Sequence, residues 1–374
     1  MLKSLTVSNF KAFAEPITID FSTTGNYEFN EEAVKDGIVK TGVMYGKNAS
    51  GKSSLGFAIF DIVVNITDNF VDMKNYLNYK NKISSLPLAS FEYKFVFGNK
   101  EVIYSYTKSD AKKIISEKFS INGKVLIEYD KSKDSNSIFI GFEGAENINI
   151  SLRQLVFSAI RFVKSNIILV ENEENQVFND FYTYVNKMLL FWSLETREFI
   201  GYTPVSGQSL IGKIVKTGHF KDLQNFFKEA GFEDELEHCL INGIEQLLIK
   251  YKNNSRLEFR LACSSGMSSL LLLYFWLEDI SDPKKCPSFI FIDEFDAFYH
   301  YELSCYIIER LKTFNCQVLL TTHNTSIFTN DLLRPDCYYI CTKDKIINAH
   351  NATPKELRLE HNLEKLYRGG AFGK

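Results

Sequence analysis

The stretch that decides the fold runs Val43-Met44-Tyr45-Gly46-Lys47-Asn48-Ala49-Ser50-Gly51-Lys52-Ser53-Ser54. It matches the phosphate-loop pattern G-x-x-x-x-G-K-[ST] at every constrained position. Gly46 and Gly51 allow the backbone to curl so that consecutive N–H groups point inward, and the following helix adds the positive end of its dipole. Lys52 is expected to reach the β- and γ-phosphates of a nucleoside triphosphate, and the Ser53 hydroxyl to bind Mg²⁺. The loop therefore predicts a nucleoside-triphosphate site, with Gly46 to Ser54 as its binding residues.

The segments on either side of this loop fit a strand and a helix. Gly37 to Tyr45 ends in a short apolar run typical of a buried strand, and Leu55 to Val64 is apolar on most faces, as a buried helix would be. Further upstream, Leu2 to Phe10 alternates polar and apolar residues, and Ile17 to Phe21 follows a proline. These two runs predict a hairpin that leads to the phosphate-loop strand.

Phe10, Lys11 and Phe13 lie between the two strands of that hairpin. They could pack at the turn, or a ring or the lysine cation could face the adenine or a phosphate. The residue types alone do not separate these two interpretations.

Size and composition set the broad class. At 374 residues the chain has room for two or three lobes. Its net charge of −3 indicates neither a nucleic-acid nor a membrane partner. Seven cysteines are scattered, none of them in C-x-x-C, which argues against a zinc site or a disulfide framework. No signal peptide and no run of about eighteen apolar residues is present. We expect a reduced, soluble, cytoplasmic protein without a membrane partner.

Two hairpin signals follow the phosphate-loop helix. Phe91–Phe97 and Val102–Tyr106 flank a Gly98-Asn99 turn, and Lys118–Tyr129 has Asn122-Gly123 at its centre. Together they predict an antiparallel sheet.

From about Leu152 to Leu248 the apolar spacing becomes helical, most clearly in Phe178–Trp192 and Phe220–Phe232. We expect a helical lobe inserted between two halves of the nucleotide fold. The absence of sustained heptads argues against a long coiled-coil arm. The aromatic residues here are interpreted as core, because they are not interleaved with Lys and Arg.

A serine-rich cluster opens the next helix. A hairpin within Ile244–Leu261, with its turn at Lys252–Ser255, precedes the cluster, and the apolar run Leu270–Leu277 follows it. The cluster, which is expected at a helix N-terminus, is either a second anion-binding position or a simple helix cap. It reads Cys263-Ser264-Ser265-Gly266-Met267-Ser268-Ser269.

Pro287-Ser288-Phe289-Ile290-Phe291-Ile292-Asp293-Glu294 is an apolar strand that ends in two carboxylates. This is the Walker B pattern. Asp293 is expected to hold the Mg²⁺ shell, and Glu294 to orient and deprotonate the attacking water.

A second buried strand with a polar end, Cys316–His323, follows a helix predicted over Tyr301–Phe314. His323 lies 30 residues after Asp293 with one helix and one strand between them. This spacing puts both residues at the same end of a parallel sheet, where ligands of open α/β folds bind. His323 is therefore predicted to contact the γ-phosphate.

Taken in order, these motifs resemble the ABC-type ATPase family, in the branch that includes SMC, RecF and OLD-type ATPases. Within that branch the chain looks most like single-chain ATPases of bacterial anti-phage systems, such as those of PARIS and Septu. An opening like Leu5–Phe13 and an ending like Asn362–Gly373 belong to the same pattern.

The resemblance covers residues 1–65 and 255–374. It implies an α/β fold with a P-loop ABC-ATPase-like core, an antiparallel β subdomain and an inserted helical lobe. The corresponding domains are 1–65 with the P-loop, 66–254 as the insertion, 255–350 with the signature, Walker B and switch histidine, and 351–374 as a tail.

The resemblance also implies residue roles. Ser265 and Gly266 would contact the γ-phosphate of ATP bound to another subunit, although Met267 and Ser268 depart from the family's usual glycine and glutamine. Asp296 would be the D-loop aspartate and His323 the switch histidine. Gln154 is the candidate for the Q-loop glutamine.

Two functions follow from this resemblance. The first is an ATP-hydrolysing switch in which two chains clamp head to tail around ATP and signal to a separate effector, since the chain ends about fifty residues after His323. The second is a RecF/SMC-like DNA-repair ATPase that binds duplex DNA. A transporter subunit fits poorly because 220 residues separate Gly46 from Gly266. An inactive scaffold is disfavoured because Lys52, Asp293 and Glu294 are all present.

Overall fold

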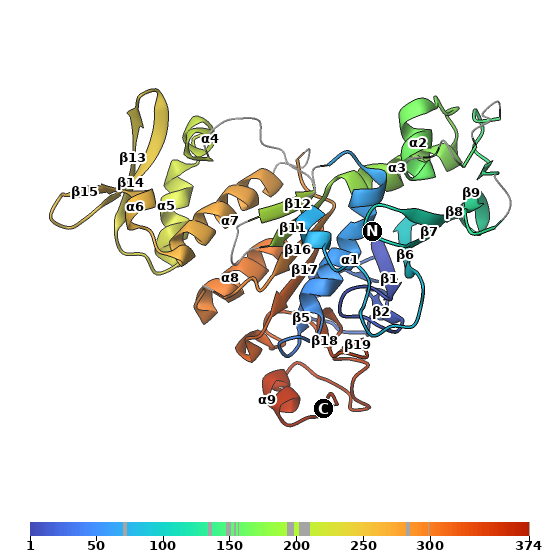
Figure 1. The fold of residues 1–374 in the computed structure, drawn as a ribbon. Helices are drawn as coiled ribbons and strands as arrows, with labels where there is room; N and C mark the ends of the chain where they lie inside the picture. The colour runs from blue at the N-terminus through green and yellow to red at the C-terminus, as the bar shows by residue number, and fades with distance from the viewer. Residues whose placement is uncertain are drawn as a thin grey trace.

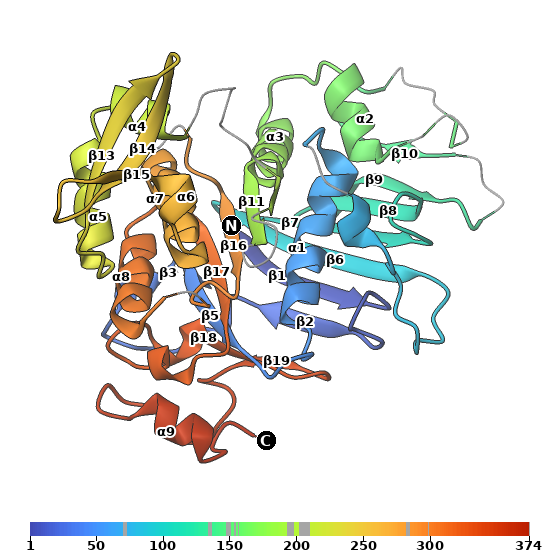
Figure 2. The ribbon, with the colours of Figure 1, turned by 60° about the vertical axis from the view of Figure 1, so that its left-hand side comes forward.

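The computed structural model describes residues 1–69, 73–133, 137–146, 151–152, 155, 157–192, 198–201, 210–281, 285–297 and 299–373. Within these residues, two seven-stranded sheets form the body of the fold, and a smaller lobe extends from one side (Figure 1). The lobe lies on the opposite side of the molecule from the antiparallel sheet (Figures 1 and 2). The fold is α/β, as expected, with a P-loop ABC-ATPase-like core and an antiparallel β subdomain.

The core sheet carries the phosphate loop. Its order is β12-β11-β16-β17-β5-β18-β19, with parallel pairing from β11 to β18 and an antiparallel strand at each edge. The inner strands β5, β16, β17 and β18 are buried at every position, because continuous apolar runs suit strands covered on both faces. The strands are β5 (Thr41–Tyr45), β11 (Met188–Trp192), β12 (Glu198–Gly201), β16 (Phe289–Asp293), β17 (Gln317–Thr322), β18 (Tyr338–Cys341) and β19 (Ile346–Asn348).

The second sheet is antiparallel throughout, in the order β10-β9-β8-β7-β6-β1-β2. The predicted hairpins are confirmed: Gly98, Asn122 and Gly123 have positive φ in their turns, as tight hairpins require. The strands are β1 (Leu2–Ser8), β2 (Ile17–Asp20), β6 (Ala89–Phe97), β7 (Lys100–Lys108), β8 (Ile114–Ile121), β9 (Lys124–Asp130) and β10 (Phe139–Ile140).

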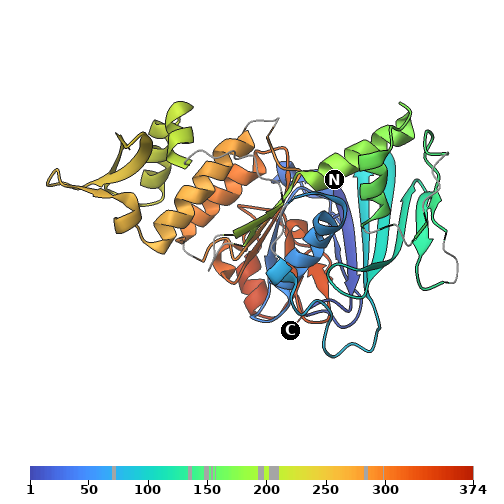
Figure 3. The same cartoon turned by 45° about the horizontal axis from the view of Figure 1, so that its top comes forward.

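Helix α1 (Lys52–Ile66) connects the two sheets (Figures 2 and 3). Towards the core sheet, an added Cβ at Gly56 would lie 2.6 Å from Cε1 of Phe291, so only glycine fits there. Towards the antiparallel sheet, Tyr93 donates a 2.5 Å hydrogen bond to the carbonyl oxygen of Ala58. The helix is thus fixed on both sides, which holds the phosphate loop at its N-terminus.

The remaining helices and short elements surround these sheets. Helix α3 packs its aromatic residues on the antiparallel sheet, with the rings of Phe181 and Phe95 5.3 Å apart. No described helix has both the length and the apolar character that crossing a membrane requires. The elements are α2 (Ala159–Asn166), α3 (Glu173–Asn186), α8 (Tyr301–Lys312), α9 (Leu363–Arg368), η1 (Glu31–Ala33), η2 (Met73–Tyr76), η3 (Thr325–Ile327), η4 (Pro335–Cys337), β3 (Val34–Lys35) and β4 (Ile38–Val39).

The lobe is less helical than the sequence predicts. Between its helices stands a three-stranded antiparallel sheet, β13-β14-β15, whose first turn is Asn242-Gly243 with positive φ at both residues. This Asn-Gly turn between alternating runs is a hairpin signal that the helical interpretation up to Leu248 overlooked. The predicted turn at Lys252–Ser255 is confirmed. The elements are α4 (Leu210–Lys216), α5 (Phe220–Glu229), β13 (Glu235–Ile241), β14 (Ile244–Lys250), β15 (Arg256–Glu258), α6 (Phe259–Ala262) and α7 (Ser265–Ser281).

The expected helix over Phe178–Trp192 is wrong in its second part. Helix α3 ends at Asn186, and Met188–Trp192 form strand β11, which pairs in parallel with β16 inside the core sheet. A run of five apolar residues carries no periodicity that separates a buried strand from a buried helix. The span 66–254 therefore contains two strands of the core sheet besides the antiparallel sheet and the lobe, and its boundaries stay a proposal.

Candidate nucleotide site

Three inner strands of the core sheet bring the predicted site residues to the end of the sheet at which these strands finish. Register pairs Tyr45 with Thr322 and Ile292 with Leu320, so β5, β16 and β17 end side by side. Because the chain continues from these ends into the phosphate loop, Asp293 and His323, the three motifs converge as predicted.

The phosphate loop has the tight geometry that its glycines predict. An added Cβ at Gly46 would collide with Oγ of Ser50 and lie 2.8 Å from the carbonyl oxygen of Cys341. Gly51 has φ 106°, and the Phe13 ring leaves no space for a side chain there, because an added Cβ would lie 2.7 Å from the ring. Ala49 also adopts a positive φ of 61°. The loop backbone is thus curled, as an anion nest requires.

The side chains of the loop divide into two groups. Lys47, Asn48 and Ala49 are exposed, whereas Ser50 is buried. Lys52 opens α1, and its residue is only 5% exposed. Ser53 and Ser54 are half-buried in the first helical turn.

Lys52 is held inside the loop by a carbonyl and a histidine. Its Nζ donates to the carbonyl oxygen of Gly46 at 2.9 Å and lies 2.9 Å from Nε2 of His323. Burial lowers the pKa of Lys52 below its ordinary value, because a charged ammonium loses hydration there. The charges of Asp293 and Glu294 oppose this lowering.

Ser53 and Asp293, the two predicted Mg²⁺ ligands, are in direct contact. The Ser53 hydroxyl donates to Oδ2 of Asp293 at 2.6 Å, and Thr321 donates to Oδ1 at 2.5 Å. Asp293 is 8% exposed, at the end of β16. A hydroxyl and a carboxylate side by side are the hard oxygen donors that Mg²⁺ takes beside a nucleotide, so these residues fit the ion.

Glu294 and His323 face each other at the mouth of the site. Oε1 of Glu294 lies 3.3 Å from Nε2 of His323, and both side chains are 37% exposed. Glu294 has φ 46°, an uncommon value for a residue with a side chain, and its N–H donates to the Thr321 hydroxyl at 2.8 Å. The turn after β16 is thereby fixed with Glu294 directed to the histidine.

Glu294 and His323 line a cavity of about 780 Å³. Side chains from the phosphate loop, from the end of β16 and from the segment after β17 meet in it. Its lining residues are Tyr45, Gly46, Lys47, Asn48, Glu294, His323, Thr325 and Tyr367.

The implied D-loop aspartate lies next to this cavity and is turned inward. Both carboxylate oxygens of Asp296 accept from the Thr322 hydroxyl, at 2.7 and 2.8 Å, and the residue is 8% exposed. Burial raises the pKa of Asp296 above its ordinary value. In this single chain Asp296 therefore holds the end of β17.

The implied signature residues lie elsewhere. Ser265 begins helix α7 in the lobe and Gly266 follows it, and Gly266 is not among the described residues that line the cavity. The hydroxyl of Ser264 accepts from the N–H of Met267 at 3.2 Å, which caps the helix. Their contact with a nucleotide of another subunit stays a prediction. Gln154 lies outside the described residues.

Of the two interpretations of Phe10, Lys11 and Phe13, the structure supports packing at the hairpin turn. Both rings are buried, and Nζ of Lys11 donates to the carbonyl oxygen of Asn75 at 2.8 Å, beside the ring of Phe57. The two rings and the cation are therefore engaged within the chain.

Some residues of the site were not predicted. Thr321 and Thr322 orient the two aspartates, and the Thr-Thr pair directly before His323 was the available signal. Tyr367 reaches the cavity from α9, and only the resemblance of the C-terminal motif pointed to that segment.

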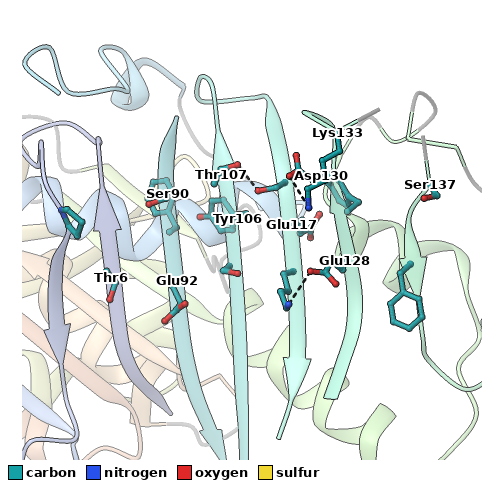
Figure 4. Close-up of a pocket in the computed structure, with 17 residues that line it drawn as sticks. Thr6, Ser90, Glu92, Tyr106, Thr107, Glu117, Glu128, Asp130, Lys133 and Ser137 are labelled. Carbon is teal, nitrogen blue, oxygen red and sulfur yellow. Dashed lines mark hydrogen bonds and ion pairs between the residues drawn. The ribbon is translucent and has the colours of Figure 1, made fainter. Parts of the chain in front are cut away.

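A second hollow, of about 620 Å³, lies on the face of the antiparallel sheet (Figure 4). Its polar side chains pair with one another: Thr107 with Ser116 at 2.7 Å, and Lys118 with Glu128 at 3.1 Å. Such mutual pairing describes a solvated sheet face and not a ligand site.

The fold and the converging motifs define an α/β domain of the P-loop ATPase class. The chain belongs to the family described as "AAA domain, putative AbiEii toxin, Type IV TA system", whose model matches residues 43–329.

Solved structures with a similar fold include SMC heads. An SMC head domain from Thermotoga maritima is 14% identical, covering 93% of this chain and 98% of that one, with a TM-score of 0.43. A structure of the SmcHead bound to the C-winged helix domain of ScpA is 16% identical over 92% and 96%, with a TM-score of 0.48. An Smc head domain with a coiled coil and joint derived from Pyrococcus yayanosii is 11% identical over 98% and 99%, also with 0.48. No curated protein matches the sequence.

Proposed function

We propose that this chain binds ATP with Mg²⁺ and hydrolyses it. The observation that carries the proposal is the contact of Lys52, His323 and Glu294 beside the Ser53–Asp293 pair. Phosphoryl transfer to water needs a cation at the phosphates, a metal site and a water-orienting carboxylate, and these residues supply all three.

Each residue has a role in this reaction. Lys52 exchanges the Gly46 carbonyl for the β- and γ-phosphates, while the curled loop backbone donates its N–H groups to the same oxygens. Ser53 and Asp293 would hold Mg²⁺, which when bound neutralises charge on the phosphate oxygens. Glu294 orients the attacking water and accepts its proton, and His323 contacts the γ-phosphate.

Measuring ATP turnover for the wild type beside Glu294→Gln tests the enzymatic part. Hydrolysis by the wild type and its loss in the variant are expected. If the wild type bound ATP but released no phosphate, the chain would be an ATP-binding protein and the proposal of hydrolysis would be wrong.

The hydrolysing unit is proposed to be a head-to-tail dimer that acts as a nucleotide-dependent switch. In support, the start of α7 with Ser265 and Gly266 lies in the lobe, apart from the residues that line the chain's own cavity. A second chain could bring such a helix start, with its N–H groups, to the γ-phosphate. Light scattering of Glu294→Gln with ATP tests this, because a slowed enzyme should accumulate as the dimer. A persistent monomer with bound ATP would count against the switch.

The biological setting is proposed to be anti-phage defence in the bacterial cytoplasm, together with a separate effector protein. The motif resemblance to the PARIS and Septu ATPases supports it, as does membership of a family whose description names a toxin. Expressing the chain with its neighbouring genes and comparing phage plating on wild type and Glu294→Gln tests this role. Equal plating on both would argue against it.

A second candidate is a RecF/SMC-like DNA-repair ATPase. Residues 343–374 contain seven Lys and Arg against four Asp and Glu, a local charge of +3. Retention on duplex DNA that weakens steeply with salt would favour this function, because phosphate contacts release counterions.

A further inference from the structure

The C-terminal segment Asn362–Gly373 borders the nucleotide site. Helix α9 lies within it, and Tyr367 of this helix lines the same cavity as Gly46, Glu294 and His323. Tyr367 therefore brings this segment to the cavity in which the terminal phosphate is expected.

Aromatic packing fixes the segment Asn362–Gly373 to the phosphate-loop strand. Phe372 is 2% exposed, and its ring lies 5.5 Å from that of Phe328. Phe328 in turn stacks on Tyr45 at 4.9 Å, with 19° between the ring planes. Since Tyr45 directly precedes Gly46, the segment is anchored to the residue from which the loop starts.

Arg368 contacts Thr325, a residue that lines the cavity, and is held by exchangeable partners. Its Nε and Nη2 donate to the Thr325 hydroxyl at 3.3 and 3.0 Å, and Nη2 pairs with Glu364 at 2.7 Å. Thr325 lines the cavity two positions after His323. The Arg368 side chain is 68% exposed, so it has room to turn.

The energetics favour an exchange of partners. The Arg368 side of the pair with Glu364 faces solvent, where an ion pair contributes little to stability and is easily exchanged. The terminal phosphate of a triphosphate offers several acceptor oxygens and more negative charge than one carboxylate, and a guanidinium binds it bidentately.

We propose that Arg368 leaves Glu364 when ATP binds and contacts the terminal phosphate, so that the C-terminal segment distinguishes a nucleoside triphosphate from a diphosphate. The inference rests on the proposed function, because it places the terminal phosphate in this cavity. It assigns the Asn362–Gly373 motif a part in reading the nucleotide state.

The test measures the affinity of the full chain for the non-hydrolysable analogue AMP-PNP and for ADP, both with Mg²⁺, by calorimetry. Arg368→Ala should weaken AMP-PNP binding about tenfold or more and leave ADP binding unchanged. Glu364→Gln tests whether Arg368 acts by contacting the phosphate or by stabilising the segment through its ion pair. The variant removes the ion pair but keeps the arginine. It should bind AMP-PNP at least as tightly as the wild type.

Arg358→Ala is the matched control, because Arg358 is an exposed arginine of the same tail and pairs with Glu356 at 2.9 Å. It should change neither affinity. The inference is overturned if Arg368→Ala weakens both nucleotides equally, if it weakens neither, or if Glu364→Gln is as damaging as Arg368→Ala. Failure of the proposed function looks different, because the wild type would then bind neither nucleotide.

Discussion

Nζ of Lys52 lies 2.9 Å from Nε2 of His323, although 271 positions separate the two residues. The same ring nitrogen is 3.3 Å from Glu294. When unprotonated it accepts from Lys52, and when protonated it donates to Glu294. Lys52 of the phosphate loop, His323 and Glu294 thus form one continuous set of contacts.

Replacing the water-orienting carboxylate should separate binding from chemistry. Glu294→Gln keeps the size of the side chain but cannot accept a proton, so turnover should fall about 100-fold or more. Phosphate-release assays measure turnover, and nucleotide affinity should stay unchanged. Glu302→Gln, an exposed carboxylate at the start of α8, is the control and should keep full turnover. A Glu294→Gln enzyme with wild-type turnover would remove Glu294 from the mechanism.

The contact between Ser53 and Asp293 predicts a metal-dependent affinity. Wild-type chain should bind ADP more tightly with Mg²⁺ than with a chelator, because the ion joins these oxygens to the phosphates. In Asp293→Asn this difference should shrink, since the amide lacks the negative charge. Titration of a fluorescent ADP with and without Mg²⁺ measures it, with the exposed Asp331→Asn as control. An undiminished Mg²⁺ effect in Asp293→Asn would place the ion elsewhere.

The ion pair between Lys108 and Asp61 joins α1 to the antiparallel sheet, and both side chains are fully buried. Lys108→Ala leaves the Asp61 carboxylate without its cation and should lower the free energy of unfolding by about 3–5 kcal/mol. Urea denaturation measures the change. The matched control is Lys118→Ala, which breaks an exposed pair with Glu128 and should cost no more than about 1 kcal/mol. Similar losses in both variants would show that burial of the pair does not matter.

Asp296 predicts a pH dependence of stability. Its pKa in the folded chain is raised by burial above the ordinary 3.8, so the folded state binds its proton more tightly than the unfolded state. Ionising Asp296 therefore lowers the free energy of unfolding. This loss is zero well below pH 3.8, grows as the pH rises, and becomes constant above the raised pKa. The nearby His323, when protonated, opposes this shift.

Asp296→Asn stays neutral and can still accept from the Thr322 hydroxyl. Its melting temperature relative to the wild type should therefore rise between pH 4 and 8 and then become constant, as thermal unfolding at several pH values would measure. A difference that does not vary with pH would mean that the carboxyl group titrates normally.

The sequence by itself determined which residues stand at the ends of the strands that form the candidate site. The phosphate loop, Asp293, Glu294 and His323 each follow or precede a continuous apolar run, so each could be assigned to the end of a buried strand from local pattern alone. The Asn-Gly and Gly-Asn turns likewise determined the hairpins of the antiparallel sheet, because positive φ is a local demand.

Only the tertiary structure decided how distant segments share one sheet. Met188–Trp192 are apolar at every position and therefore equally suited to a helix or a strand, until the neighbouring edge of β16 supplies hydrogen bonds for a strand. Contacts such as Thr321 with Asp293, or the approach of Tyr367 to the phosphate loop, depend on which strand ends lie side by side. Periodicity reports the environment of one segment, whereas a binding cavity is set by the relative positions of several.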